Sequence, residues 1–341
     1  MATGTRTING GPALKDMSYP MTIYGINEPK PGARWKALFD ATWPAYKAWY
    51  LSGDDRDRPD LAMARQMLRK HMPELMPTYN ELVKLAGGDE TAARMLTLWD
   101  APRFLPGCSQ AVLTDPVPVL CRNYDYSPDL FEQVVYSSAF TGRLVIGTGD
   151  CLWGLLDGMN EDGLAVSLTF GGLPGSGPGF AIPLVVRYLL EVCASVADAR
   201  TVLGRLPVSM AYNLTMVDAT GNNLTAFVAQ ERKPEFSDAI VATNHRGAVP
   251  DCPDHARMYR SVERREKLVE LLSSRPTPDQ LAGAMLKPPL YSDRYSRSFG
   301  TLYTAVYRPK DKFVDYIWPD RTWRRTFGDS DESITVVLNE R

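Results

Sequence analysis

Two short apolar runs on either side of an Asp-Pro pair constrain the fold of this chain more than any other feature. The runs are residues 111–113 and 117–120, and Asp115 and Pro116 stand between them. Apolar runs separated by turn-forming residues are typical of paired strands. The sequence therefore predicts a β-hairpin over this region.

The predicted hairpin places reactive side chains together. A turn centred on the Asp-Pro pair sets Cys108 opposite about Asn123, so Arg122 and Asp125 fall beside the cysteine. Opposite residues of an antiparallel pair are close enough for their side chains to interact. We therefore expect a thiol, a guanidinium and a carboxylate at one end of a sheet.

The composition is that of an ordinary globular protein. The chain has 341 residues, of which 44% are hydrophobic and 23% charged, enough for one large domain or two. A net charge of −2 gives no electrostatic reason to expect nucleic acid or an acidic membrane as a partner. We expect the partner to be a small molecule or a peptide-like amide.

The cysteines indicate a reduced protein without a metal site. The five are widely spaced and none belongs to a C-x-x-C pair, so neither a zinc site nor a thioredoxin-like motif is predicted. No stretch reads as a signal peptide or reaches the ~20 apolar residues of a membrane span. These observations predict a cytoplasmic protein that uses no metal or other cofactor.

The order of the predicted elements favours an α+β fold in layers. Residues 1–34, rich in Gly, Pro and Thr, are expected to form an extended arm that is partly ordered at best. Helical periodicity dominates up to about residue 99, and short β runs follow. Predicted helices are 35–51, the region 60–86 with interruptions at Pro73 and Pro77, 89–96, 182–192, 196–206, 257–272 and 278–286. Predicted strands are 144–147, 152–160, 164–170, 212–218, 223–229, 239–243, 299–307, 312–318 and 333–338, with tight turns at Asp157-Gly158 and at 161–163. Runs of strands separated by paired helices suggest layers rather than a parallel βαβ array.

Four motifs together resemble the N-terminal-nucleophile hydrolases of the penicillin acyltransferase type, which are akin to choloylglycine hydrolases and penicillin V acylases. They are Gly-Cys at 107–108, Arg-Asn-x-Asp at 122–125, the run at 159–168, and Thr-Asn-His at 243–245. The resemblance extends over roughly residues 76–338. It implies a four-layer αββα sandwich, preceded here by a mainly helical N-terminal segment.

The resemblance also implies that the chain cuts itself. The cut would fall between Gly107 and Cys108 and separate a fragment of residues 1–107 from a catalytic core of residues 108–341. The freed α-amine would then be the base. Its reference pKa of about 7.7–8 lies near that of a thiol, about 8.5, so no histidine partner is needed.

Further roles follow from the resemblance by position. Arg122 would favour the thiolate and Asp125 would orient the amine. Asn244 matches an oxyanion-hole asparagine, and Arg257 could match an arginine that follows it in some relatives. Thr169 stands where related enzymes often carry asparagine. An apolar acyl pocket could be lined by the aromatic residues Tyr124, Trp153 and Phe170.

The predicted activity is that of an amide hydrolase or acyltransferase that passes an acyl group through a thioester on Cys108. Water and an amine are both open as acceptors. Two alternatives remain. One is a papain-like pair of Cys108 with His245, oriented by Asn244 or Asp254, which needs no cleavage. The other is a non-catalytic scaffold whose precursor never matures and whose helical segment is a plug or a contact in a homo-oligomer.

Overall fold

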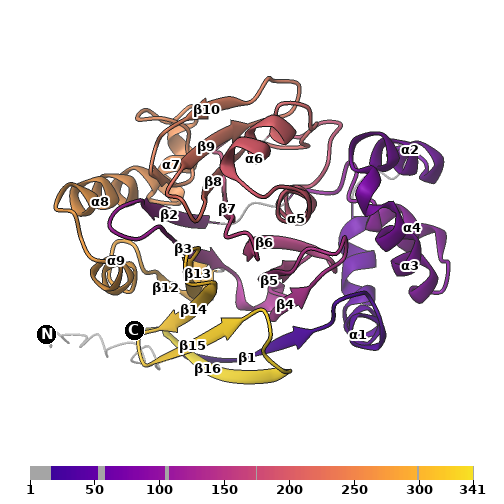
Figure 1. Ribbon diagram of the computed structural model, residues 1–341, viewed down its shortest axis with the longest axis horizontal. Helices are drawn as coiled ribbons and strands as arrows, with labels where there is room; N and C mark the ends of the chain where they lie inside the picture. The colour runs from indigo at the N-terminus through magenta and orange to yellow at the C-terminus, as the bar shows by residue number, and fades with distance from the viewer. Residues whose placement is uncertain (1–16, 53–57, 104–106, 174, 298, 341) are drawn as a thin grey trace, which may run out of the picture.

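Two β-sheets face each other between two layers of helices (Figure 1). The computed structural model describes residues 17–52, 58–103, 107–173, 175–297 and 299–340. Helices α5 (Ile182–Val192) and α6 (Val196–Leu203) cover the first sheet, and α8 (Ser261–Ser273) and α9 (Pro278–Met285) cover the second. The predicted four-layer αββα sandwich is confirmed.

The first sheet contains a strand from each end of the described chain. Its order is β10 (Glu235–Ser237), β9 (Asn223–Val228), β8 (Tyr212–Val217), β7 (Ala165–Phe170), β6 (Gly154–Asn160), β5 (Val145–Asp150), β4 (Val134–Ser138), β1 (Met17–Asn27) and β16 (Glu332–Glu340). Neighbouring strands are antiparallel except β1 and β4.

Strand β1 corrects the expectation of a loosely ordered arm at residues 1–34. It lies between β4 and β16, and its alternate residues Met21 and Ile23 are buried. Alternation of this kind gives a strand one face in the core. The rest of that prediction, residues 1–16, lies outside the described residues.

The second sheet carries the predicted hairpin. Its order is β11 (Val241–Ala242), β2 (Gly107–Leu113), β3 (Val119–Tyr126), β13 (Phe299–Arg308), β14 (Phe313–Trp318) and β15 (Arg321–Thr326), with β12 (Asp293–Arg294) beside β13. The hairpin of β2 and β3 is confirmed, but its register differs by one residue from the expectation, because Cys108 pairs with Tyr124.

The length of the loop explains the shift in register. Tight two-residue hairpin turns need a positive φ, which proline cannot adopt, so the strands are joined by the longer segment 114–118. Residues opposite each other share a face. Cys108, Tyr124 and Arg122 therefore point toward the first sheet, whereas Asp125 points toward the helical layer of α8 and α9.

The N-terminal helices lie at one end of the sandwich (Figure 1). They are α1 (Ala33–Tyr50), α2 (Leu61–His71), the short 3₁₀ helix η2 (Pro73–Leu75), α3 (Met76–Leu85) and α4 (Glu90–Leu96). Two further 3₁₀ turns are η3 (Pro128–Leu130) and η4 (Tyr295–Arg297).

The helix predicted at 257–272 is divided in two. The region 257–272 consists of the end of α7 (Pro253–Met258) and of α8, separated by Arg260 in a left-handed conformation with φ of 50°. A residue with positive φ interrupts the helical hydrogen bonding. The break allows α8 to begin in a new direction and to place its own side chains on the second sheet.

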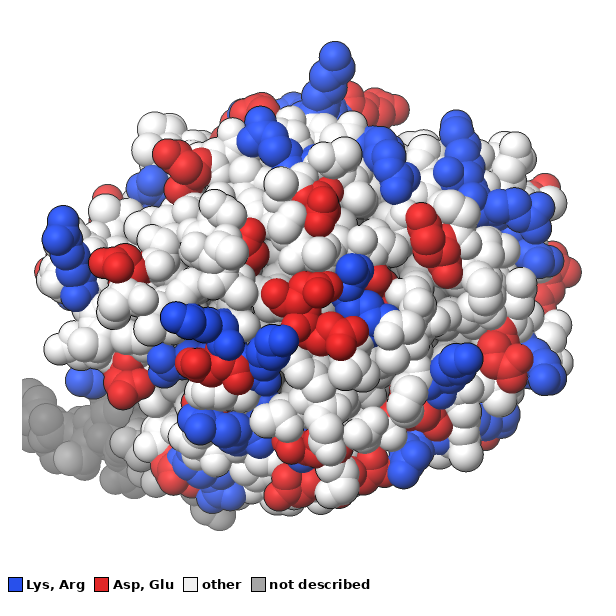
Figure 2. Space-filling view, viewed as in Figure 1, with Lys and Arg blue, Asp and Glu red and all other residues white. Residues whose placement is uncertain are grey.

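Charges of both signs are interspersed over the face shown in Figure 2. Among the helices that the structure describes, none is both long enough and apolar enough to cross a membrane.

Candidate active site

Cys108 lies in β2 with its side chain fully buried. Its Sγ accepts a hydrogen bond from Nη2 of Arg122 at 3.2 Å. Burial raises the pKa of the Cys108 thiol, and the guanidinium of Arg122 opposes that rise. The contact favours the thiolate, which is the nucleophilic form of cysteine.

Arg122 is held in place by Asp157 of β6. Its Nη1 forms a buried ion pair with that carboxylate. Asp157 also accepts hydrogen bonds from the hydroxyls of Thr148 at 2.8 Å and Tyr303 at 2.6 Å. The guanidinium thus has a fully satisfied counter-ion behind it and offers its other nitrogen to Cys108.

Asp157 was not among the predicted site residues. With Gly158 it forms an Asp-Gly pair, which reads as a turn in the sequence but lies inside β6. A Cβ at Gly158 would lie 2.8 Å from the backbone carbonyl oxygen of Ile146 in β5 and 2.7 Å from a methyl group of Leu190 in α5. Close packing of sheet and helix, rather than a turn, therefore requires the glycine.

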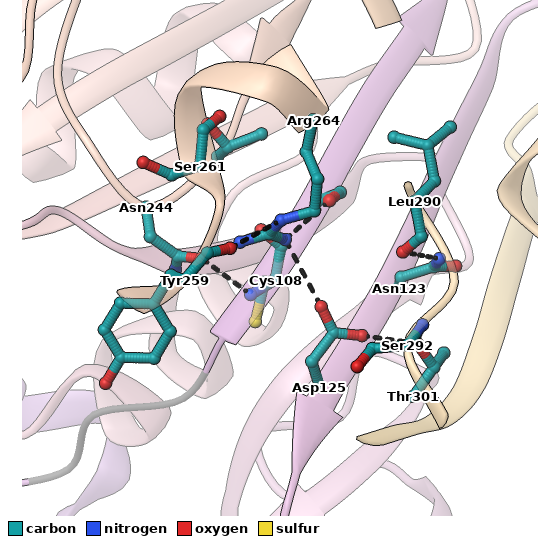
Figure 3. Close-up of polar contacts among 12 residues, drawn as sticks. Cys108, Asn123, Asp125, Asn244, Tyr259, Ser261, Arg264, Leu290, Ser292 and Thr301 are labelled. Carbon is teal, nitrogen blue, oxygen red and sulfur yellow. Dashed lines mark hydrogen bonds and ion pairs between the residues drawn. The ribbon is translucent and has the colours of Figure 1, made fainter. Parts of the chain in front are cut away.

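The backbone of Cys108 is held from the opposite side (Figure 3). Its N–H donates to Oδ1 of Asn244 at 3.1 Å, and its carbonyl accepts from Nη1 of Arg264 at 2.6 Å. Nη2 of Arg264 donates to the same Oδ1 at 2.6 Å. An asparagine and an arginine thus fix the peptide group on both sides of the Cys108 Cα.

Asp125 completes this group. It lies opposite Gly107 in the strand pair and accepts from Arg264 at 3.2 Å and from Thr301 at 2.6 Å. Burial raises the pKa of Asp125, while the charge of Arg264 lowers it. A Cβ at Gly107 would lie 2.1 Å from the ring of Phe299, so a side chain there would require that ring to move. The Gly107–Cys108 peptide bond consequently lies beside the carboxylate.

Arg264, rather than the predicted Arg257, is the arginine that contacts the backbone of Cys108. The side chain of Arg257 is 74% exposed and pairs with Asp254, so the structure does not bring it to Cys108. Arg264, seven residues later, makes the contacts instead. A signal for it exists in the sequence: Arg264 and Leu268 occupy one buried face of α8 at helical spacing.

Thr169 and Phe170 contact the segment that carries Asn244. Thr169 donates to the carbonyl of Thr243 at 2.8 Å, and the carbonyl of Phe170 accepts from Nδ2 of Asn244 at 3.4 Å. The ring of Phe170 contacts that of Tyr259. Both residues therefore position the segment that carries Asn244.

Tyr124 and Trp153 have different surroundings. The ring of Tyr124 lies under the guanidinium of Arg122 at 5.0 Å, and its buried phenol oxygen has no hydrogen-bond partner in the described part of the chain. Trp153 is buried in the core and donates from its indole to the carbonyl of Leu96 at 3.0 Å. Tyr124 is thus adjacent to Cys108, whereas Trp153 joins the core to α4.

The geometry gives His245 no role beside the thiol. Its Nδ1 lies 2.8 Å from the hydroxyl of Ser261 and 3.3 Å from that of Thr243, and burial lowers its pKa to about 4. The sulfur contact of Cys108 is made by Arg122. A papain-like pair would require the imidazole to contact the sulfur.

Comparison with known families matches residues 112–323 to the family described as acyl-coenzyme A:6-aminopenicillanic acid acyl-transferase. The matched range contains Arg122, Asp125, Asn244 and Arg264, and it begins four residues after Cys108. No curated protein matches the chain.

Solved structures that are similar to the chain include the following three. A mutant conjugated bile acid hydrolase from Clostridium perfringens has 13% identity and a TM-score of 0.46, over 67% of this chain and 96% of that chain. Penicillin V acylase from Agrobacterium tumefaciens has 14% identity and a TM-score of 0.42, over 64% of this chain and 84% of that chain. The Caenorhabditis elegans ortholog of N-acylethanolamine-hydrolyzing acid amidase has 16% identity and a TM-score of 0.44, over 60% of this chain and 93% of that chain.

The family match covers more than half of the 341 residues and includes the polar groups around Cys108. The chain therefore belongs to the acyl-coenzyme A:6-aminopenicillanic acid acyl-transferase family.

Proposed function

We propose that this protein is a self-cleaving cysteine amide hydrolase or acyltransferase that acts on a small N-acyl amide. The observation that carries the proposal is the environment of one peptide bond. Arg122 contacts the sulfur of Cys108, while Asn244 and Arg264 hold the nitrogen and carbonyl of the same residue. Asp125 lies across the strand pair from Gly107.

Self-cleavage would begin at Cys108. Its Sγ attacks the carbonyl carbon of Gly107, an S–C bond forms, and the C–N bond to Cys108 breaks. The nitrogen of Cys108 gains the proton that the thiol loses. Water then hydrolyses the thioester, which gives Gly107 a carboxylate and restores the thiol. The chain of 341 residues becomes fragments of 107 and 234.

The same groups would then serve turnover. The new α-amine of Cys108 takes the thiol proton, and the thiolate attacks the carbonyl carbon of the substrate amide. The amine portion of the substrate then leaves with that proton, and the acyl group remains on the sulfur. Arg122 stabilises the thiolate, and Nδ2 of Asn244 supplies a donor for the developing oxyanion. Arg264 and Asp125 are positioning residues for the amine. Water or a second amine releases the acyl group from the thioester.

The two fragments would remain together after the cut. Strand β1 of the first fragment pairs with β4 and β16 of the second, and its helix α1 contacts the core through Trp35, whose indole donates to the carbonyl of Leu152 at 2.9 Å. We therefore propose residues 1–107 as a retained part of the mature enzyme. The five cysteines are free thiols, which supports a reducing compartment such as the cytoplasm.

Intact-mass spectrometry of the purified protein tests the proposal. The wild type is expected as two fragments separated at Gly107–Cys108, and Cys108→Ala as one uncut chain. Cys121→Ala is the matched control, because Cys121 is a buried thiol in the same hairpin and should leave cleavage intact.

Incubation of the mature protein with N-acyl amides of graded chain length should add the acyl mass to the fragment that begins at Cys108. An uncut wild type that forms an acyl-enzyme would favour the histidine mechanism. An uncut wild type that reacts with no acyl amide would favour the scaffold. Either result would overturn self-cleavage at this bond.

A further inference from the structure

Two further carboxylates, those of Glu132 and Asp150, line a pocket of about 290 Å³ between α1 and the sheet core. Its walls come from both parts of the chain, the one that precedes the Gly107–Cys108 bond in the sequence and the one that follows it. Helix α1 contributes Tyr46 and Trp49, and the core contributes Tyr126, Phe131, Glu132 and Asp150. The pocket opens beside Leu130, which is 61% exposed.

The carboxylates of Glu132 and Asp150 each have one oxygen that accepts hydrogen bonds. Oε1 of Glu132 accepts from the phenol of Tyr46 and from the backbone N–H of Leu152, the latter at 2.6 Å. Oδ1 of Asp150 accepts from the backbone N–H of Cys151 at 2.6 Å. These bonds hold Cys151 and Leu152, which both have positive φ.

The other two oxygens lack partners. Oε2 of Glu132 and Oδ2 of Asp150 are buried and have no hydrogen-bond partner in the described structure. Asp150 is only 4% exposed, and no lysine, arginine or histidine among the described residues forms an ion pair with either group. A buried charged oxygen without a partner is costly, so these two atoms need a positive ligand or a proton.

The lining of the pocket selects the kind of cation. Trp49, Tyr126 and Phe131 present aromatic rings, which attract organic ammonium groups through their faces. Within the described residues, no cluster of three or more His, Cys, Asp or Glu side chains could hold a metal ion. The geometry therefore fits an ammonium group better than a metal.

Burial also changes the protonation of the two carboxylates. Burial, followed by the neighbouring charge of Asp150, raises the pKa of Glu132, and burial raises the pKa of Asp150. The pair of carboxylates therefore retains a proton near neutral pH. Tyr46, the titratable residue that α1 directs at both carboxylates, stays protonated because burial raises its pKa well above the usual range.

Tyr124 connects this pocket to the proposed nucleophile. It pairs with Cys108 across the hairpin, and its ring packs against Tyr126 at 5.7 Å and Phe131 at 5.8 Å, both of which line the pocket. Tyr124 thus packs against rings that line the pocket and is paired with the residue that carries the sulfur.

We propose that this pocket binds an ammonium group that the substrate carries in addition to the amide that is cut. The inference rests on the proposed function, since it defines the substrate class for Cys108. It also assigns α1, from the first fragment, to the substrate site of the second.

Direct binding tests the pocket without any turnover. The full-length Cys108→Ala protein is titrated by calorimetry with butylammonium and, separately, with butanol. The cation is expected to bind at least about tenfold more tightly, because aromatic faces and a carboxylate pair both favour positive charge. The double variant Glu132→Gln with Asp150→Asn should lose this difference, whereas Asp279→Asn, on exposed α9, should keep it.

Equal affinity for the two probes, absence of cation binding, or a difference that persists in the double variant would overturn the inference. Cooperative thermal unfolding of each variant is verified first. If the double variant does not fold, Glu132→Gln alone replaces it, because its amide oxygen can still accept from the N–H of Leu152.

Turnover separates this inference from the proposed function. The mature enzyme receives the N-acyl derivative of butylamine and the mono-N-acyl derivative of diaminobutane, with the same acyl chain. We expect kcat/KM to favour the charged substrate by roughly tenfold, with the ratio approaching one in the double variant. Equal kcat/KM values in the wild type would refute the ammonium site and leave the proposed function standing. Failure to convert either substrate, together with an unacylated Cys108, would refute the proposed function while calorimetry still decides the pocket.

Discussion

Replacement of Arg122 by lysine should slow self-cleavage while leaving the fold intact. Arginine serves two partners at once, with Nη1 on Asp157 and Nη2 on the sulfur of Cys108. Lysine keeps the charge but has one ammonium on a narrower head group and cannot reproduce the fork. We expect the ammonium to remain with the carboxylate and to abandon the thiol.

The size of the effect follows from the contact that is lost. A hydrogen bond that involves a charged group contributes about 1.5–3 kcal/mol, and each ~1.4 kcal/mol of barrier changes a rate tenfold. Loss of the contact at 3.2 Å between Arg122 and the sulfur should slow cleavage by roughly 10- to 100-fold. The same loss should lower the melting temperature by roughly 1–4 °C in a protein of this length.

The assay follows the appearance of the first fragment after cell-free synthesis of the chain. Arg187→Lys is the matched control. Arg187 is also a fully buried arginine with a carboxylate partner, Glu191, and it donates to the carbonyl of Trp153 at 2.9 Å, but it does not contact Cys108. Its replacement should cost similar stability and leave the cleavage rate within about twofold.

Two results would refute this reasoning. Cleavage of Arg122→Lys at a rate within about twofold of the wild type would show that the guanidinium does not assist the thiol. An equal slowing in Arg187→Lys would show that general loss of stability, rather than the contact with Cys108, controls the rate.

Three further predictions follow from the same structure. Arg264→Ala should abolish detectable cleavage, since the Cys108 carbonyl loses its donor, whereas Arg257→Ala at the exposed position should cleave normally; the 107-residue fragment reports both. Burial raises the pKa of Glu132 to about 8, so the folded state holds a proton that the unfolded state releases above about pH 4.3, and stability should fall as pH rises toward 8. Urea midpoints should show this slope in the wild type, and Glu132→Gln should flatten it. Burial lowers the pKa of His245 to about 4, so its contribution to stability is present above about pH 6.5 and is lost as the pH falls toward 4. His245→Gln should reduce that loss. If the urea midpoints of the variant fell with acid as steeply as those of the wild type, the assignment to His245 would be wrong.

Local patterns in the sequence predicted much of the fold. The helix expected at 182–192 is α5 with those bounds, and the strand expected at 212–218 is β8 at Tyr212–Val217. The start of α6 is encoded by Ser195 and Asp198, which form a capping box. These features depend on neighbours within one or two turns of chain. The sequence could not show β1 in the same way, because its stability depends on β4 and β16 far along the chain.

The candidate active site also combines features that local sequence predicts with features that depend on the tertiary structure. Cys108, Arg122 and Asp125 lie on one hairpin, so their proximity follows from strand pairing alone. The choice of Arg264 over Arg257 required the layered structure, since α8 must pack on β2 before the side chain of Arg264 can reach the strand that carries Cys108.

Asp157 and the carboxylate pair of Glu132 and Asp150 were decided entirely by tertiary structure. In the sequence, Asp157 reads as a turn residue, and no pattern singles out Glu132 or Asp150. Only the stacking of two sheets against each other and of α1 against the core removes them from water. Periodicity and motif spacing specify which atoms a segment exposes on each face. Which distant face those atoms meet is set by sheet order and layer packing, and this determines their charge, their partners and their chemistry.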